Sequence, residues 1–158
     1  MALPYRSSRK KQVRAYILIG DGFDEYEVIC FLHRFRQLGL PIKSVSLFDK
    51  LVFSHQGVGI KADYSLADKP FDAIRDECML ILPSGGRNGD KLRRDARVKS
   101  LLEQFNSRYS QIVLTDSESD LALDIGQLKM QQPTFLRQFD ERLEDFVESL
   151  TNRMVFVN

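Results

Sequence analysis

A chain of 158 residues is long enough for one domain with a sizeable core and too short for two ordinary domains. Hydrophobic residues make up 43% and charged residues 28%, which is typical of a globular protein, and a formal net charge of +1 provides no overall field toward nucleic acid. Two cysteines without CxxC spacing and two histidines argue against a disulfide scaffold, a zinc site and a histidine-based triad. We therefore expect neither a metal nor a cofactor.

Basic side chains gather within the first fourteen residues: Arg6, Arg9, Lys10, Lys11 and Arg14. We expect residues 1–13 to form a disordered, solubilising arm and residues 14–158 to form a single domain; a nucleic-acid or membrane contact of the arm is the alternative. The arm lacks the apolar core of a secretory signal, and no later run is long enough to span a bilayer. These features predict a soluble cytoplasmic protein with no part in the membrane.

Hydrophobic patterns of strand and helix type alternate along the chain. In the first half they predict a buried strand at 15–20, a helix at 25–38 ended by Gly39, a strand at 43–48, a hairpin of 51–53 and 58–60, and a connector at 65–73. In the second half they predict a buried strand at 78–82, a turn-rich loop at 82–90, a helix at 90–107, a buried strand at 111–115, a helix at 117–125 stopped by Gly126, irregular chain at 127–133, a helix at 139–150 and a last short strand at 154–158. This alternation predicts an α/β fold, a three-layer sandwich with a mostly parallel sheet and helices on both faces.

Candidate functional residues follow the first two buried strands. After the first strand, Asp24, Glu25 and Glu27 crowd into the first helical turn, where the helix dipole favours negative charge. We expect Glu27 to be the one that points into the cleft; a phosphate-binding loop is less favoured, because the third glycine of a dinucleotide fingerprint is absent. After the next strand, Gly85 and Gly86 either present N–H groups to an anion or make a turn that needs positive φ.

The third loop, TDSESD at 115–120, is rich in hydroxyls and carboxylates. Ser117 and Ser119 are suited to cap and begin a helix. A serine nucleophile would need a nearby base, but His33 is predicted on the first helix and His55 in the hairpin. Helix capping is therefore the favoured interpretation of this loop.

Three stretches within residues 15–126 carry a resemblance: AYILIGDGFDEYEV, LILPSGGRNGDKLRRDARVKSLLEQF and IVLTDSESDLALDIG. In this order they resemble the ThiJ/PfpI (DJ-one) family of the class I glutamine amidotransferase-like superfamily. The resemblance implies a flavodoxin-like arrangement and a homodimer. It also places the family's GxxxxE glutamate at Glu27 and its oxyanion loop at Gly85 and Gly86, although that loop is one residue longer than the family's Pro-Gly-Gly.

The chain departs from the family at the third loop. The family's nucleophilic cysteine falls at Asp116 and is followed by Ser117, while the family's downstream histidine has no counterpart. Cys30 is predicted on the first helix, and Cys78 at the end of its strand that is far from the cleft. The resemblance therefore implies a pseudoenzyme that acts as a binding or regulatory module through an unknown protein partner or small-molecule ligand. Its candidate pocket holds Glu27, Gly85, Gly86, Asp116 and Ser117.

Two other functions stay open. In the first, a small-molecule hydrolase or glyoxalase-type enzyme uses Glu27 and Asp116 as an acid/base pair, because two adjacent carboxylates raise the pKa of one of them. In the second, the basic arm and three arginines of the predicted long helix, Arg93, Arg94 and Arg97, contact nucleic acid. The small net charge makes nucleic acid the less favoured partner.

Overall fold

The computed structural model describes residues 13–68, 78–105, 111–128 and 134–156. Within them, a six-stranded sheet has the order β5-β2-β1-β6-β7-β8, and every neighbouring pair is parallel. Its strands are β1 (Arg14–Ile19), β2 (Ile42–Ser46), β5 (Tyr64–Ser65), β6 (Cys78–Leu82), β7 (Gln111–Leu114) and β8 (Thr134–Leu136). The other elements are the antiparallel hairpin of β3 (Leu51–Phe53) and β4 (Gly59–Lys61), and the helices α2 (Glu25–Gln37), α3 (Asn88–Arg94), α4 (Ala96–Phe105), α5 (Asp120–Gln127) and α6 (Leu143–Phe156).

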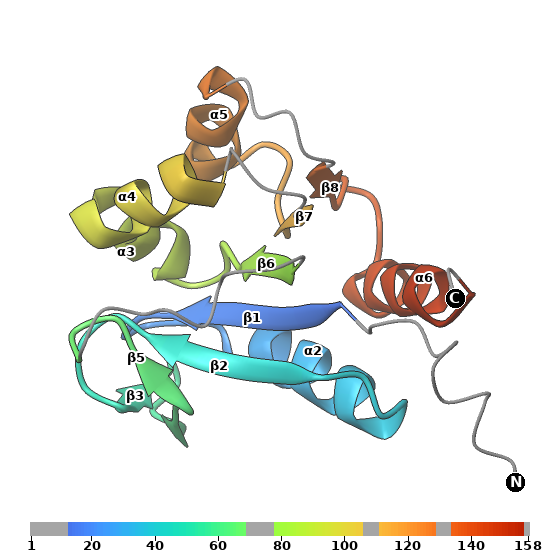
Figure 1. Cartoon of the computed structure of the whole chain (residues 1–158), viewed down its shortest axis with the longest axis horizontal. Helices are drawn as coiled ribbons and strands as arrows, with labels where there is room; N and C mark the ends of the chain where they lie inside the picture. Colours follow the sequence, from blue (N-terminus) through green and yellow to red (C-terminus); the bar gives the residue numbers. More distant parts are fainter. Residues whose placement is uncertain (1–12, 69–77, 106–110, 129–133, 157–158) are drawn as a thin grey trace, which may run out of the picture.

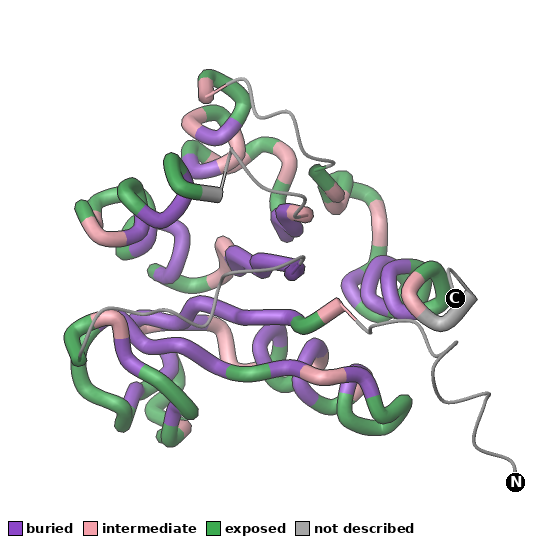
Figure 2. Tube along the Cα trace, in the orientation of Figure 1, coloured by how far each residue is buried: buried purple, intermediate pink, exposed green. Residues whose placement is uncertain are grey.

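The helices cover both faces of the sheet (Figure 1). Alternate residues of β1 point to opposite sides: Ala15, Ile17 and Ile19 pack with α2 and α6, whereas Tyr16 and Leu18 pack with the layer of α3, α4 and α5. The strands β1, β6 and β7 are buried along most of their length between these layers (Figure 2). The predicted three-layer α/β sandwich with a mostly parallel sheet is confirmed.

The first helix shows how local sequence sets an element. The side chain of Asp24 caps α2 by accepting a hydrogen bond from the N–H of Glu27 at 3.1 Å. Gly39 follows the C-cap residue with a φ of +71°, a conformation that glycine adopts without steric cost. The predicted helix at 25–38 and its end at Gly39 are confirmed.

The predicted long helix at 90–107 is wrong, because it is two helices separated at Asp95. The backbone of Asp95 is extended, with φ of −92° and ψ of 120°. Its carboxylate accepts hydrogen bonds from the N–H groups of Arg97 at 2.8 Å and Val98 at 3.4 Å. An aspartate that can satisfy the free N–H groups of a helix start favours a new helix over a continuous one.

The C-terminal third needs further correction. Gly126 does not stop α5 but lies inside it, and the helix begins at Asp120 after Ser119 rather than at Ser117. The predicted helix at 139–150 begins instead at Leu143, and Phe139 is exposed outside it. The predicted strand at the end is wrong for residues 154–156, which continue α6. The apolar face of the helix, formed by Leu143, Phe146, Val147 and Leu150, continues to Met154 at the same spacing of three and four residues.

Two short strands escape the sequence patterns. β5 pairs with β2 where a connector was predicted, and β8 pairs with β7 beyond the predicted irregular chain. Both lie at an edge of the sheet, and two or three residues are too few to show a hydrophobic period. Parts of several predictions lie outside the described part of the chain: residues 1–12 of the disordered arm predicted at 1–13, residues 69–73 of the connector, residues 106–107 of the long helix, residues 129–133 of the irregular chain and the last two residues.

No helix among the described residues combines the length and the apolar composition that crossing a membrane requires.

The hairpin is fastened to the loop after β1. Gly22 donates its N–H to the carbonyl of Phe53 at 2.8 Å, and the N–H of Phe53 donates to Oδ1 of Asp21 at 3.0 Å. The N–H of His55 donates to the carbonyl of Phe23 at 2.7 Å. These bonds hold the chain between β1 and α2 in place, and with it the start of α2.

Replacing Asp95 with Ala should lower the free energy of unfolding by about 1 kcal/mol, because the first N–H groups of α4 lose their acceptor. Asp95→Asn keeps a capping oxygen and should retain most of that stability. Urea denaturation of both variants measures the difference. Equal losses for the two substitutions would show that the carboxylate acts through its ion pair with Arg97 and not as a cap.

Candidate functional site

A buried carboxyl lies at the carboxyl ends of the central strands. Glu27, in the first turn of α2, is only 6% exposed. Its Oε1 accepts a hydrogen bond from the N–H of Gly85 at 2.9 Å, and the hydroxyl of Thr115 is its second polar partner. Glu27 thereby joins the loop after β1 to the loops after β6 and β7.

Burial shifts the titration of this carboxyl. The pKa of Glu27 is raised, chiefly because burial disfavours the charged form. The hydrogen bonds from Gly85 and Thr115 act in the opposite direction, as does the positive charge of Arg137, while the negative charge of Asp24 adds to the rise. The protonated form of Glu27 therefore persists above the pH at which an exposed glutamate ionises.

Gly85 is held so close to the first loop that no other residue fits. A Cβ at this position would lie 2.7 Å from Cβ of Asp24 and 2.9 Å from Oε1 of Glu27. The N–H of Gly85 already donates to Glu27, so the donor that was expected to face an oxyanion is bound within the protein. The next residue, Gly86, has a φ of +60° and forms a bridge with Phe23, as a turn that needs positive φ does.

The buried side-chain amide of Asn88 joins the loop after β1 to the loop after β6. Asn88 is fully buried and donates from Nδ2 to the carbonyl of Pro83 at 2.7 Å and to that of Leu18 at 3.1 Å. Its Oδ1 accepts from the N–H of Gly20 at 2.6 Å. Three hydrogen bonds from one side chain therefore set how the end of β1 lies against the end of β6. Nothing in the sequence pattern distinguished Asn88 from an ordinary loop residue.

The third loop turns its polar groups toward its own backbone. Asp116 is exposed, and its Oδ1 accepts the N–H of Glu118 at 2.9 Å. Ser119 caps α5 by accepting the N–H of Ala122 at 3.1 Å, which confirms the capping interpretation of TDSESD. The N–H of Ser117 donates to the carbonyl of Arg137 at 3.1 Å.

Thr115 is the residue of the third loop that contacts Glu27. The sequence predicted Thr115 only as the last residue of a strand. Thr115 is buried, and its hydroxyl oxygen accepts the N–H of Ser84 at 2.8 Å. Arg137 is a second residue that the sequence did not indicate. It donates from Nη1 to the carbonyl of Thr115 at 3.4 Å and from Nε to that of Glu141 at 2.8 Å. Its position follows from β8, which brings residues 134–136 beside β7.

Both cysteines lie where the sequence placed them, and neither forms a disulfide. Cys30 is half-buried in α2, and burial is the main cause that raises the pKa of its thiol. Cys78 is buried at the start of β6, where it lies opposite Arg14 at the amino end of β1. Among the residues the structure describes, no three His, Cys, Asp or Glu side chains form a group that could hold a metal ion.

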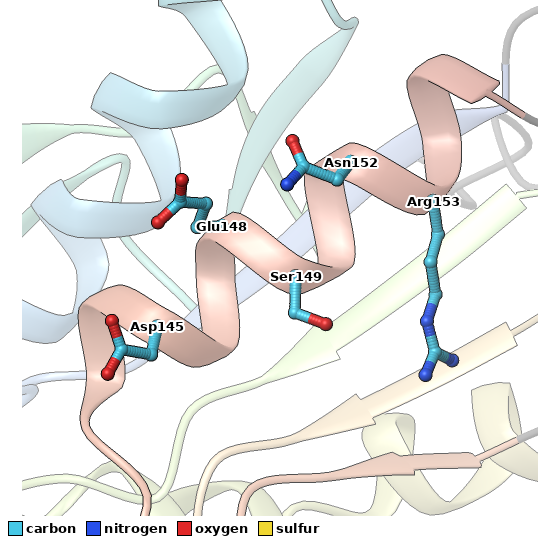
Figure 3. A pocket seen from close by; sticks show the side chains of 5 residues that line it. All are labelled: Asp145, Glu148, Ser149, Asn152 and Arg153. Carbon is cyan, nitrogen blue, oxygen red and sulfur yellow. The ribbon is translucent and has the colours of Figure 1, made fainter.

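Two open depressions lie on the surface of the described chain. One of about 530 Å³ is lined by five side chains that all project from α6, Asp145, Glu148, Ser149, Asn152 and Arg153 (Figure 3). The other, of about 560 Å³, runs along α5 to Leu136 and includes Ser117 in its lining. Neither of these depressions is lined by Glu27 or Gly85.

The raised pKa of Glu27 makes stability depend on pH. Between its unfolded and its folded pKa, the folded chain binds more protons than the unfolded chain, so the free energy of unfolding falls as pH rises through this window. Glu27→Gln lacks this component and keeps an oxygen for the N–H of Gly85. In urea denaturation from about pH 4 to about pH 8, the stability of Glu27→Gln relative to wild type should therefore rise with pH.

The exposed Glu118→Gln variant is the control, and its stability relative to wild type should change little over the same pH range. A difference between Glu27→Gln and wild type that stays flat or falls with pH would contradict the assignment of a raised pKa to Glu27.

Several solved structures have the same fold as this chain. Schizosaccharomyces pombe DJ-1 is 20% identical, with 89% of this chain and 91% of that chain covered at a TM-score of 0.70. Drosophila melanogaster DJ-1beta is 17% identical, with 91% of both chains covered at a TM-score of 0.67. Oxidized Toxoplasma gondii DJ-1 is 14% identical, with 91% of both covered at a TM-score of 0.70. At such identities the likeness establishes the fold alone.

A comparison with curated protein sequences finds no significant match. The model of the DJ-1/PfpI family, by contrast, matches residues 13–151, which include every described strand and all but the end of α6. The chain therefore belongs to the DJ-1/PfpI family.

Proposed function

We propose that this chain is a catalytically degenerate DJ-1/PfpI domain that acts as a binding or regulatory module and forms a homodimer. The observation that carries the proposal is the hydrogen bond of 2.9 Å from the N–H of Gly85 to Glu27. An acyl-transfer site needs a free oxyanion donor and a carboxyl that faces the reacting atoms. Here the donor and the carboxyl are bound to each other inside the protein.

The residue at the end of the third core strand supports the same proposal. The family pattern places a cysteine where this chain has Asp116, and a carboxylate is a poor nucleophile toward carbonyl carbon. Asp116 is exposed, and its carboxylate accepts the N–H of Glu118. Glu27 accepts the N–H of Gly85 and Asp116 accepts the N–H of Glu118, so the hydrogen bonds of the two carboxylates give an acid/base pair no support.

An apolar surface supports the homodimer. Leu51, Phe53 and Val58 of the hairpin and Ile29 of α2 are each about half exposed. The side chains of Leu51 and Phe53 lie together over Gly59, since a Cβ there would be 3.6 Å and 3.1 Å from them.

Ile29 lies one helical turn beyond Glu25, whose carboxylate accepts the hydroxyl of Ser54 in the hairpin. Exposed apolar side chains gathered in this way are typical of a surface that another molecule covers, and membership of a family that commonly dimerises favours a second copy.

An activity assay tests the degenerate site. Purified protein should show no turnover of methylglyoxal or of simple esters and amides above the buffer rate, because it lacks an activated nucleophile. The same assay on Glu27→Gln and Asp116→Asn should give results indistinguishable from wild type. Wild-type turnover that either substitution abolishes would overturn the binding-module proposal in favour of an enzyme with an acid/base pair.

Light scattering after size-exclusion chromatography tests the dimer. The wild-type chain of 18.3 kDa should elute with about twice that mass. Phe53→Asp places a charge in the apolar surface and should shift the mass to that of one chain. Leu123→Asp changes an exposed leucine on α5 and should leave the dimer intact. A wild-type monomer, or a dimer unaffected by Phe53→Asp, would contradict the proposed interface.

A further inference from the structure

The exposed face of α3 presents three cations in a row. Arg87, Lys91 and Arg94 are exposed and follow one another at four and three residues, so they lie on one side of the helix about 6 Å and about 5 Å apart along its axis. None of them forms an ion pair with another residue that the structure describes. Residues 87–94 hold four basic side chains and one acidic, Asp90, in a chain whose formal net charge is only +1.

The other arginines of this region are neutralised by partners. Arg93 pairs with Asp124 of α5 at 2.9 Å and lies 3.7 Å from Asp120. Arg97 pairs with Asp95 at 2.8 Å. Of the three arginines that the sequence suggested for nucleic-acid contact, Arg94 alone is free of an ion pair with a described residue. The structure adds Arg87, which precedes α3, and Lys91 within α3; both lie close to glycines of the loop after β1, Arg87 to Gly22 and Lys91 to Gly20.

An exposed aromatic ring borders this row of cations. Phe48 is 66% exposed, and the guanidinium of Arg97 lies over its ring at 4.3 Å from the centroid. Leu47, the residue before Phe48, and Lys91 are neighbours, because a Cβ on Gly20 would be 3.1 Å from Leu47 and 3.2 Å from Lys91. The chain after β2 therefore runs beside α3 at Lys91 and beside the start of α4 at Arg97, which places Phe48 next to the helix that carries the cations.

We propose that this surface, Arg87, Lys91, Arg94 and Phe48, binds single-stranded nucleic acid. Exposed cations on one helix face supply contacts for successive phosphates, and the exposed ring of Phe48 supplies a platform on which an unpaired base stacks. A duplex offers no free base to the ring, and an acidic peptide has no use for a stacking platform. Asp90 and the adjacent Asp49 reduce the local charge, so we expect moderate affinity with strong salt dependence.

Fluorescence anisotropy of a labelled oligothymidylate of about 20 nucleotides with the full-length protein tests this proposal, at about 50 mM and about 200 mM KCl. Binding should weaken steeply at the higher salt. Lys91→Ala/Arg94→Ala should weaken binding by about tenfold at the lower salt and flatten the salt dependence, because two phosphate contacts are lost. Phe48→Ala should weaken it by about tenfold with an unchanged salt dependence, because stacking carries no charge.

Arg93→Ala is the matched control, since it removes one positive charge from the same helix at a position that is already ion-paired. Its affinity should stay within about twofold of wild type. Three results would each overturn the proposal: no binding by the wild type at low salt, an equal loss of affinity in Arg93→Ala, or unchanged binding in the Lys91→Ala/Arg94→Ala variant. The last result would assign binding to the basic arm. Displacement by polyglutamate together with unchanged binding of Phe48→Ala would overturn it in favour of an acidic protein partner. These outcomes are independent of whether the Glu27 site is active.

Discussion

One buried carboxyl connects the parts of this protein that carry its candidate function. Glu27 lies in the first turn of α2 and accepts a hydrogen bond from the N–H of Gly85, in the loop after β6. The hydroxyl of Thr115, which follows β7, is its other polar neighbour. A buried carboxyl without such partners would be strongly destabilising, so the three loops must approach closely and stay in register. That requirement explains why residue 85 has no side chain: any Cβ there would collide with Asp24 and Glu27.

The same hydrogen bonds support the proposal that the site has lost its catalytic chemistry. In a parallel α/β sheet, ligands commonly bind where the loops beyond the strands diverge. Here Glu27, Gly85 and Asn88, which lie beyond the strand ends, form hydrogen bonds with other groups of the protein. The family fold is thus retained, while polar groups at the carboxyl ends of its central strands form hydrogen bonds within the protein. This arrangement is consistent with a domain whose interactions take place on its outer surfaces, since fold and activity are separable.

The outer surfaces divide by chemistry. The hairpin and the adjacent part of α2 expose apolar side chains, whereas α3 exposes cations beside Phe48. Ion pairing decides which cations remain available: Arg93 is bound to the acids of α5, and Arg97 to Asp95. The proposed dimer contact thus uses apolar side chains of the hairpin and α2, and the proposed nucleic-acid contact uses cations of α3 and the ring of Phe48.

Local chemistry in the sequence was enough to predict the central strands, α2 with its cap and terminating glycine, and the layered fold, because hydrophobic period and capping residues act over a few positions. It was enough to single out Glu27 and Gly85 separately. Their bond to each other, the roles of Thr115, Asn88 and Arg137, and the exposure of Asp116 depend on contacts between residues far apart in the chain, such as Asn88 and Leu18, which are 70 positions apart. The division at Asp95 also escaped the hydrophobic pattern, which runs through it unchanged. Only the packed sheet and its loops decide such pairings, since a hydrogen bond between distant residues leaves no periodic trace in the sequence.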